Sequence, residues 1–254
     1  DMGWSSDSID LDDWMTIYCE ARYGGYPDAM EEAWKLFRKT AYSSLYSYPR
    51  FTWQTVIPDQ RRISKIDLSD DYLQAIRLYA SCADELKSSE LYRNDLIEFV
   101  SYYVAAKAEN FYKQALKDDS ENRVLAAQRN LQQTVDLLMD VDRLLASHPL
   151  YRLEEWVELA RNSGTTLQEK DAYEANAKRL ITSWGGIQED YAARFWSGLI
   201  KDYYIPRIQL YFTKDRNKIR EWEEQWITSP WINSTTPFDD PVEAALNLIE
   251  KTNK

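Results

Sequence analysis

The chain has 254 residues, of which 44% are hydrophobic, and it carries a formal net charge of −11. The hydrophobic content is enough for a substantial core, so we expect a single domain over residues 1–254. The acidic surface repels phosphate backbones and anionic lipid heads, and no apolar run approaches the roughly 20 residues that span a bilayer, so neither nucleic acid nor a membrane is expected as a partner.

The spacing of apolar residues indicates helices and argues against a parallel sheet. Only 7 Gly and 8 Pro occur, whereas the eight strand-to-helix turns of a (β/α)8 barrel normally demand more glycine. Apolar side chains recur at the spacings of a helix from end to end, which predicts an all-α fold with about nine helices in antiparallel pairs and no substantial sheet.

Three helices are predicted in the first third of the chain. They run from Asp10 or Asp12 to Tyr23, from Pro27 to about Tyr42, and from the cap Ser69 to about Lys87. Capping residues, the proline and the pair Gly24-Gly25 mark their ends. Residues 44–68, between the second and third helices, are predicted to form one long irregular loop, a kind of segment that often serves function.

The middle of the chain is predicted to contain two long helices and two shorter ones. Residues 89–117 and 120–147 are expected to pack as an antiparallel hairpin. Residues 151–162 form a short helix, and residues 166–184 form another that ends at Gly185-Gly186.

Further helices are predicted in the last quarter. One spans Asp190 to about Lys214, with a kink near Asp202 because Pro206 removes a backbone hydrogen bond. A charged helix with two tryptophans follows, then a Pro/Ser/Thr-rich loop over 228–237 and a short helix from about Pro241.

Catalytic and metal-binding motifs are sparse. Neighbouring acids on a helix point about 100° apart, so acidic doublets are interpreted as solvated faces. These doublets are Glu31-Glu32, Glu154-Glu155, Glu223-Glu224 and Asp239-Asp240. The chain has 1 His, His148, which is predicted to cap a helix end. No Asp-Asp-x-x-Asp motif occurs, so we predict no metal and no cofactor.

The two cysteines, Cys19 and Cys82, form no Cys-x-x-Cys motif. We interpret them as two small buried side chains, and a disulfide between them is the alternative that the sequence leaves open.

Most of the aromatic residues carry a polar group, the indole N–H of Trp or the hydroxyl of Tyr, since there are 10 Trp and 18 Tyr against 7 Phe. This excess favours half-buried seams, interfaces or sugar-stacking platforms over a sealed core. The aromatics gather around 184–207. From the residues alone, this region is either a large interlocking core or a polar-rimmed pocket.

The same region resembles the C-terminal helical domain of alpha-N-acetylglucosaminidases, glycoside hydrolase family 89. The blocks that carry the resemblance are Trp184, Asp190-Tyr191-Ala192, Trp196-x-Gly198-Leu199 and Asp202-Tyr203-Tyr204-x-Pro206-Arg207. Further blocks in the same order are Arg22-Tyr23-Gly24, Ala33-Trp34, Trp156 with Arg161, and Tyr173-Glu174-x-Asn176. The resemblance covers roughly residues 10–215.

The resemblance implies an accessory domain of a larger, exo-acting enzyme that removes terminal alpha-linked GlcNAc. The family's two catalytic glutamates belong to a (β/α)8 barrel of the same polypeptide, so no catalytic residue and no turnover are expected in this chain alone. The implied partners are that barrel and a GlcNAc-terminated glycan, and the implied compartment is secreted, periplasmic or lysosomal. We expect that residue 1 is the point at which this chain was cut from a longer polypeptide.

Three residues are carried over from the resemblance as substrate-binding: Trp184, Tyr191 and Arg207. For Arg207, an anchoring role through a carboxylate is an equally supported alternative. Two other function classes stay open at this point. The chain could be a stand-alone helical carbohydrate-binding or interaction module, or an independent all-α glycosidase whose two acids converge from distant helices.

Overall fold

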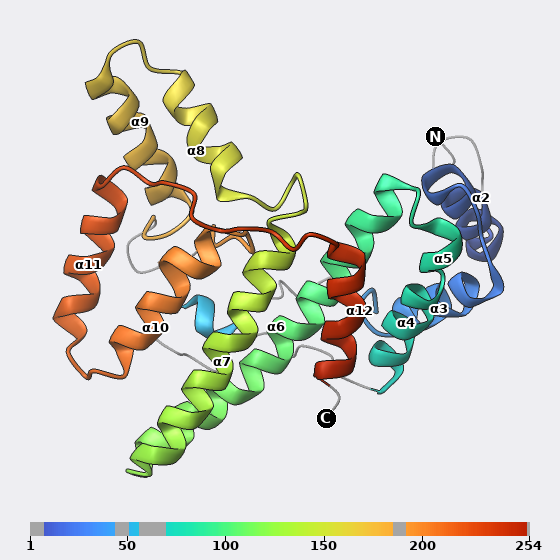
Figure 1. The fold of residues 1–254 in the computed structure, drawn as a ribbon, viewed down its shortest axis with the longest axis horizontal. Helices are drawn as coiled ribbons and strands as arrows, with labels where there is room; N and C mark the ends of the chain where they lie inside the picture. Colours follow the sequence, from blue (N-terminus) through green and yellow to red (C-terminus); the bar gives the residue numbers. More distant parts are fainter. Residues whose placement is uncertain (1–7, 44–50, 56–69, 185–191, 253–254) are drawn as a thin grey trace. The chain divides into compact units, whose positions relative to one another are not determined.

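The computed structural model describes residues 8–43, 51–55, 70–184 and 192–252. Its α-helices are α2 (Leu11–Tyr23), α3 (Asp28–Lys39), α4 (Asp70–Ser81), α5 (Ala83–Leu86), α6 (Glu90–Ser120), α7 (Val124–Leu145), α8 (Leu153–Asn162), α9 (Leu167–Leu180), α10 (Ile205–Tyr211), α11 (Arg216–Thr228) and α12 (Pro241–Lys251) (Figure 1). In these ranges the one strand-like pairing is an isolated parallel bridge between Arg152 and Ser197. The predicted all-α fold is confirmed.

The chain divides into two compact units. The first comprises Asp1–Ser47, Asp67–Tyr103 and Asp240–Lys254, and the second comprises Tyr48–Ile66 and Val104–Asp239. Helix α6 contributes its first part to one unit and its remainder to the other. The single domain over 1–254 stays a prediction.

The first unit has an aromatic core around α3 and α4, which pack against each other. Tyr79 and Tyr92 are stacked at 4.9 Å, and Phe99 packs edge-on to Tyr79 at 5.2 Å. The Tyr92 hydroxyl donates to the Tyr79 carbonyl at 2.8 Å. Both tyrosines are fully buried. Their hydroxyl groups therefore lie in this core and not at an interface, which the excess of Trp and Tyr over Phe had favoured.

The Arg22-Tyr23-Gly24 block has a structural explanation in this unit. Arg22 donates to both carboxylate oxygens of Asp95, at 2.7 and 2.5 Å, and the Tyr23 hydroxyl donates to the same carboxylate at 2.6 Å. Gly24 ends α2 with φ +84°, a left-handed conformation that favours glycine. The predicted end of the first helix is thereby confirmed.

Both cysteines are buried thiols without a disulfide, as predicted. Burial raises the pKa of Cys19 to about 12 and that of Cys82 to about 11. Neither thiol is therefore activated as a nucleophile.

The second unit contains two antiparallel helix pairs. In the first pair, Asn130 of α7 donates to Asp118 of α6 at 2.8 Å, and Thr134 approaches the Ala108 carbonyl at 3.5 Å. The order of these contacts confirms the predicted antiparallel hairpin of the two long helices. Helices α8 and α9 form the other pair (Figure 1).

The predicted helix from Asp190 to Lys214 begins too early. Residues 193–196 are neither helix nor strand, and regular helical structure starts at Leu199. Gly198 adopts φ +82°, and a Cβ there would lie 2.7 Å from Cζ2 of Trp231. This left-handed residue separates the extended segment from the helix, a break that helical spacing alone does not reveal.

Where the kink near Asp202 is predicted, the structure has a π-helical turn, η4 (Ile200–Tyr204). Pro206 has no N–H to give to the Asp202 carbonyl, and the Ile205 N–H bonds to the Ile200 carbonyl.

Smaller differences concern helix ends and one loop. The second helix ends at Lys39, earlier than predicted, and the third is divided into α4 and α5 at Cys82. The predicted loop contains a buried 3-10 turn, η1 (Thr52–Gln54). The predicted cap Ser69 and helix stop Gly185-Gly186 lie outside the described residues.

His148 is a buried structural residue just after α7. Its Nδ1 accepts the N–H of Leu150 at 3.1 Å, and its ring packs edge-on to Tyr151 at 4.6 Å. It therefore stabilises the turn that follows the helix.

Candidate functional site

Trp184 follows α9 and lies at the surface. Its backbone N–H bonds to the Arg179 carbonyl at 3.0 Å, and its side chain is 48% exposed. Trp184 is the one exposed tryptophan among those that the structure describes. Exposed indoles can stack on a sugar or on a neighbouring domain.

The other two predicted residues have different positions. Tyr191 lies outside the described residues. Arg207 is 1% exposed, and its Nη2 donates to the Gln54 carbonyl at 2.6 Å. Its Nη1 donates to Glu223 at 3.2 Å and to the Tyr203 hydroxyl at 3.1 Å. This geometry matches the anchoring alternative, and a substrate-facing role for Arg207 stays a prediction.

Glu223 corrects the interpretation of the acidic doublets as solvated faces. It is 5% exposed and pairs with Arg207, whereas Glu224 is exposed and pairs with Arg179 at 2.7 Å. Because successive side chains on α11 point about 100° apart, one acid of the doublet faces inward and the other faces solvent.

The remaining polar residues of the Asp202-to-Arg207 block also bond within the second unit. Asp202 accepts the indole N–H of Trp231 at 2.9 Å. The Tyr203 hydroxyl donates to Glu223 at 2.7 Å, and the Tyr204 hydroxyl donates to the Arg194 carbonyl at 3.0 Å. The most specific block of the resemblance thus holds four separate segments together.

Asp142 is a central residue that sequence reasoning missed. It is fully buried in α7, and its carboxylate accepts the N–H groups of Gly198 at 2.8 Å and Lys201 at 3.1 Å. The Thr235 hydroxyl donates to it at 2.6 Å. An acid at the start of a helix satisfies free N–H groups, and here it comes from a distant helix. The available signal was an aspartate on the apolar stripe of residues 120–147.

Burial raises the pKa of Asp142 above its ordinary value, against the lowering effect of its hydrogen bonds from Thr235, Lys201 and Gly198. Burial likewise raises the pKa of Asp202. Two acids with raised pKa values therefore lie around the start of one helix.

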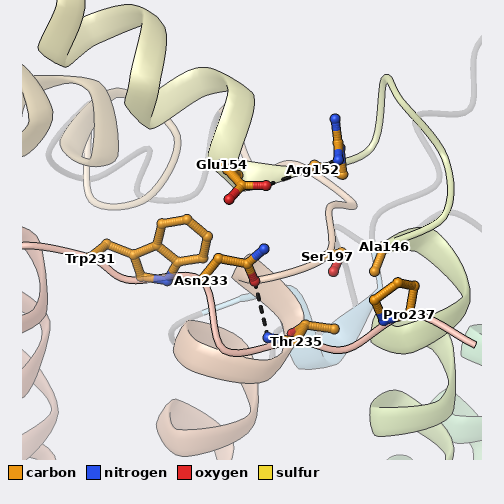
Figure 2. A pocket seen from close by; sticks show the side chains of 8 residues that line it. All are labelled: Ala146, Arg152, Glu154, Ser197, Trp231, Asn233, Thr235 and Pro237. Carbon is orange, nitrogen blue, oxygen red and sulfur yellow. Dashed lines mark hydrogen bonds and ion pairs between the residues drawn. The ribbon is translucent and has the colours of Figure 1, made fainter.

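A small pocket is lined in part by Trp231 and Thr235, which hydrogen-bond to these two acids. Figure 2 shows Arg152 and Glu154 on one side of it and Trp231, Asn233 and Thr235 on the other. Its volume is about 80 Å³, and a water molecule occupies about 30 Å³ of liquid volume. The pocket therefore has room for a few waters or one substituent, and not for a whole hexose.

A second hollow lies on the surface of α6 and α10. It is an open groove of about 600 Å³ lined by Asn110, Lys113, Lys117 and Tyr211, among others. Neither of these two hollows is lined by Trp184 or Arg207. The described residues also contain no group of three or more His, Cys, Asp or Glu side chains placed to hold a metal ion.

The family model for the alpha-N-acetylglucosaminidase C-terminal domain matches residues 14–251 of the chain. The chain belongs to this family. Human alpha-N-acetylglucosaminidase is 29% identical over 228 residues, which are 83% of this chain and 30% of the human protein. The chain thus spans under a third of that relative's length.

Solved structures show the same fold. A family 89 glycoside hydrolase from Clostridium perfringens, in complex with PUGNAc, superposes with a TM-score of 0.84 at 22% identity. The match covers 98% of this chain and 32% of the bacterial one. The same scores hold for its complex with 2-acetamido-1,2-dideoxynojirmycin and for a double Glu-to-Gln variant in complex with its substrate GlcNAc-alpha-1,4-galactose.

The blocks that carry the family resemblance mostly form internal bonds, as Arg22, Tyr23 and Arg207 do. Trp156 and Arg161 follow the same rule, since the Trp156 indole donates to the Ala177 carbonyl at 2.9 Å and Arg161 pairs with buried Glu174 at 2.6 Å. Trp184 and Tyr173 are exposed aromatic members of the set, at 48% and 44%.

Proposed function

We propose that the chain is the C-terminal part of an exo-acting, retaining alpha-N-acetylglucosaminidase. In the whole polypeptide it packs on a catalytic (β/α)8 barrel, and Trp184 forms part of the wall of the barrel's sugar pocket. The substrate is a glycan that ends in alpha-linked GlcNAc, the sugar in the substrate of the Clostridium relative. The barrel supplies the catalytic carboxylates.

The exposure of Trp184 is the observation that carries the proposal. The indole is 48% exposed, and transfer of its apolar face out of water is favourable. The flat face of the ring suits the apolar face of a pyranose. The coverage of 30% of the human relative agrees with an accessory part of a larger enzyme.

The test is a kinetic comparison in the full-length polypeptide with an aryl alpha-GlcNAc substrate. Trp184→Ala is expected to lower kcat/KM by about tenfold, which corresponds to about 1.4 kcal/mol of lost binding in the transition state. Trp184→Phe should recover part of the loss because it keeps an aromatic face.

Tyr173→Ala is the matched control, since Tyr173 is a 44% exposed aromatic on α9. It should leave kcat/KM within twofold of the wild type. Unchanged kinetics for Trp184→Ala would remove this residue from the sugar pocket.

A further inference from the structure

The open groove on α6 and α10 is the larger of the two hollows in the second unit. Its volume of about 600 Å³ falls within the range of ligand-binding pockets. On the α6 side, three lining positions recur every three or four residues, so they form a stripe along one face of the helix. These positions are Asn110, Gln114 and Lys117. Tyr211, the last residue of α10, lines the groove as well.

The stripe on α6 offers hydrogen-bonding groups that the fold leaves unused. The side chains of Asn110 and Lys117 are exposed and form no hydrogen bond or ion pair within the described part of the chain. Gln114 donates its amide N–H to Asp118 at 2.9 Å, which leaves the amide oxygen of Gln114 as an acceptor. The stripe therefore presents both donors and acceptors, the combination that the hydroxyl groups of a sugar require.

Tyr211 adds an aromatic ring to this polar stripe. The residue is half-buried, and its ring contacts Phe212 edge-on with a centroid distance of 5.9 Å. Phe212 in turn contacts Tyr112 at 6.2 Å, and Tyr112 is fully buried in α6. These contacts connect Tyr211 to the core, so its ring can serve as a fixed surface on which the apolar face of a pyranose stacks.

The charges around the groove favour a neutral ligand. Lys113 pairs with the buried Glu109 at 3.2 Å, and Asp119 pairs with Lys214 at 3.3 Å. Lys117 is thus the one charged lining residue that has no ion pair with another described residue. A single ammonium group does not match a phosphate or a sulfate, which proteins typically bind through bidentate arginines or several charged donors.

The position of Lys117 also has a structural explanation. A cation in the last turn of α6 interacts favourably with the helix dipole. The dipole does not account for the hollow itself, for the unused amide of Asn110 or for the ring of Tyr211 on the neighbouring helix. These three features together point to a ligand.

We propose that this groove, the α6 groove, is a binding site for a neutral pyranose unit of a glycan. Tyr211 stacks on the apolar face of the sugar, and the side-chain amides of Asn110 and Gln114 bond to its hydroxyl groups. The choice of a sugar as the ligand rests on the proposed function, in which the substrate is a glycan. Because the groove is open, the expected affinity is in the millimolar range.

The experiment measures binding of methyl β-galactoside to the full-length polypeptide by saturation-transfer NMR. Galactose is the second sugar in the substrate of the Clostridium relative. Tyr211→Ala is expected to raise Kd about fivefold because the stacking surface is lost, whereas Tyr211→Phe keeps the ring and should stay within about twofold of the wild type. Asn110→Ala should raise Kd about threefold through the loss of one hydrogen bond.

Asn110→Ala keeps the test decisive if Tyr211→Ala disturbs the packing against Phe212. Asn110 is exposed, and its side chain makes no bond within the described residues, so its replacement should not affect folding. Tyr173→Ala is the matched control, since Tyr173 is an exposed aromatic residue that does not line the groove. It should leave Kd unchanged.

No saturable signal, or the same Kd in the wild type, Tyr211→Ala and Asn110→Ala, would overturn the proposal. Binding that requires a sulfated sugar and disappears as salt is raised would overturn it too, because it would mark an anion site.

Trp184→Ala separates this proposal from the proposed function. A loss of kcat/KM for the aryl substrate in Trp184→Ala, with unchanged galactoside binding in both groove variants, would sink the α6 groove alone. Unchanged kinetics in Trp184→Ala, with weaker galactoside binding in the groove variants, would sink only the pocket wall at Trp184.

Discussion

Asp142 shows how one buried acid organises several segments of the second unit. Its carboxylate binds the backbone at Gly198 and Lys201 and the hydroxyl of Thr235. Burial without a cationic partner in these contacts favours the neutral form, which explains the direction of its pKa shift. The residue is therefore a source of pH-dependent stability.

We predict that Asp142→Asn changes how stability varies with pH. Because the pKa is raised in the folded state, the folded chain binds the proton more tightly, and this contribution to stability is lost as pH rises from the ordinary aspartate value of 3.8 through the raised value. The unfolding free energy of the wild type should thus decrease relative to that of Asp142→Asn over this range. Urea unfolding at a series of pH values measures the difference.

Asp136→Asn, an exposed position on the same helix, provides the comparison. This substitution removes one carboxylate from an exposed position, so the comparison isolates the effect of burying the carboxylate. A pH-independent difference for Asp142→Asn would contradict the prediction.

At the scale of elements, α9 is the helix that leads to Trp184. It starts with a capping box in which Thr166 accepts the N–H of Glu169 at 3.2 Å and Glu169 accepts the N–H of Thr166 at 3.0 Å. Hydrogen bonds from the Thr165 side chain and then from the backbone lower the pKa of Glu169 to about 2. Local signals therefore specify where this helix begins.

Thr166→Ala should destabilise the chain by about 1 kcal/mol, the usual effect of losing an N-cap side chain. The measurement is urea unfolding at neutral pH followed by far-UV circular dichroism. Ser163→Ala removes an exposed hydroxyl from the same connection and should have a smaller effect. Equal effects of the two substitutions would show that the cap contributes nothing specific.

At the scale of the whole molecule, the chain is helical and matches only part of the length of its relatives. It spans 30% of the human relative and 32% of the Clostridium structure. None of its described helices is long and apolar enough to cross a membrane. Exposed apolar side chains such as Leu159 and Leu167, at 65% and 70% exposure, are compatible with a surface that meets another domain.

The isolated chain is predicted to be helical and catalytically inactive. Its circular dichroism should show a folded helical protein, because each unit has its own buried core. Release of the aryl group from an alpha-GlcNAc substrate should not exceed the buffer rate, whereas the full-length polypeptide should be active. Turnover that co-purifies with the isolated chain would refute the proposal that the barrel supplies the catalytic carboxylates.

The sequence by itself determined the elements whose signals are local. Asp10 and Gly24 mark the two ends of α2, and Asp240 caps α12, since each acts through backbone groups within a few residues. Helical spacing was sufficient for the all-α class. The blocks around Trp184 and Arg207 were sufficient for the family, which the match over 14–251 confirms.

Only the tertiary structure decided what the individual residues do. The break at Gly198 depends on Trp231 and Asp142, and the role of Arg207 depends on Gln54, 153 residues away in the sequence. Helical spacing records which side of a helix is buried, but not which distant group it meets there. For that reason the exposure of Trp184, the burial of Arg207 and the support of Arg194 by Tyr204 could be established only when the folded chain brought these segments together.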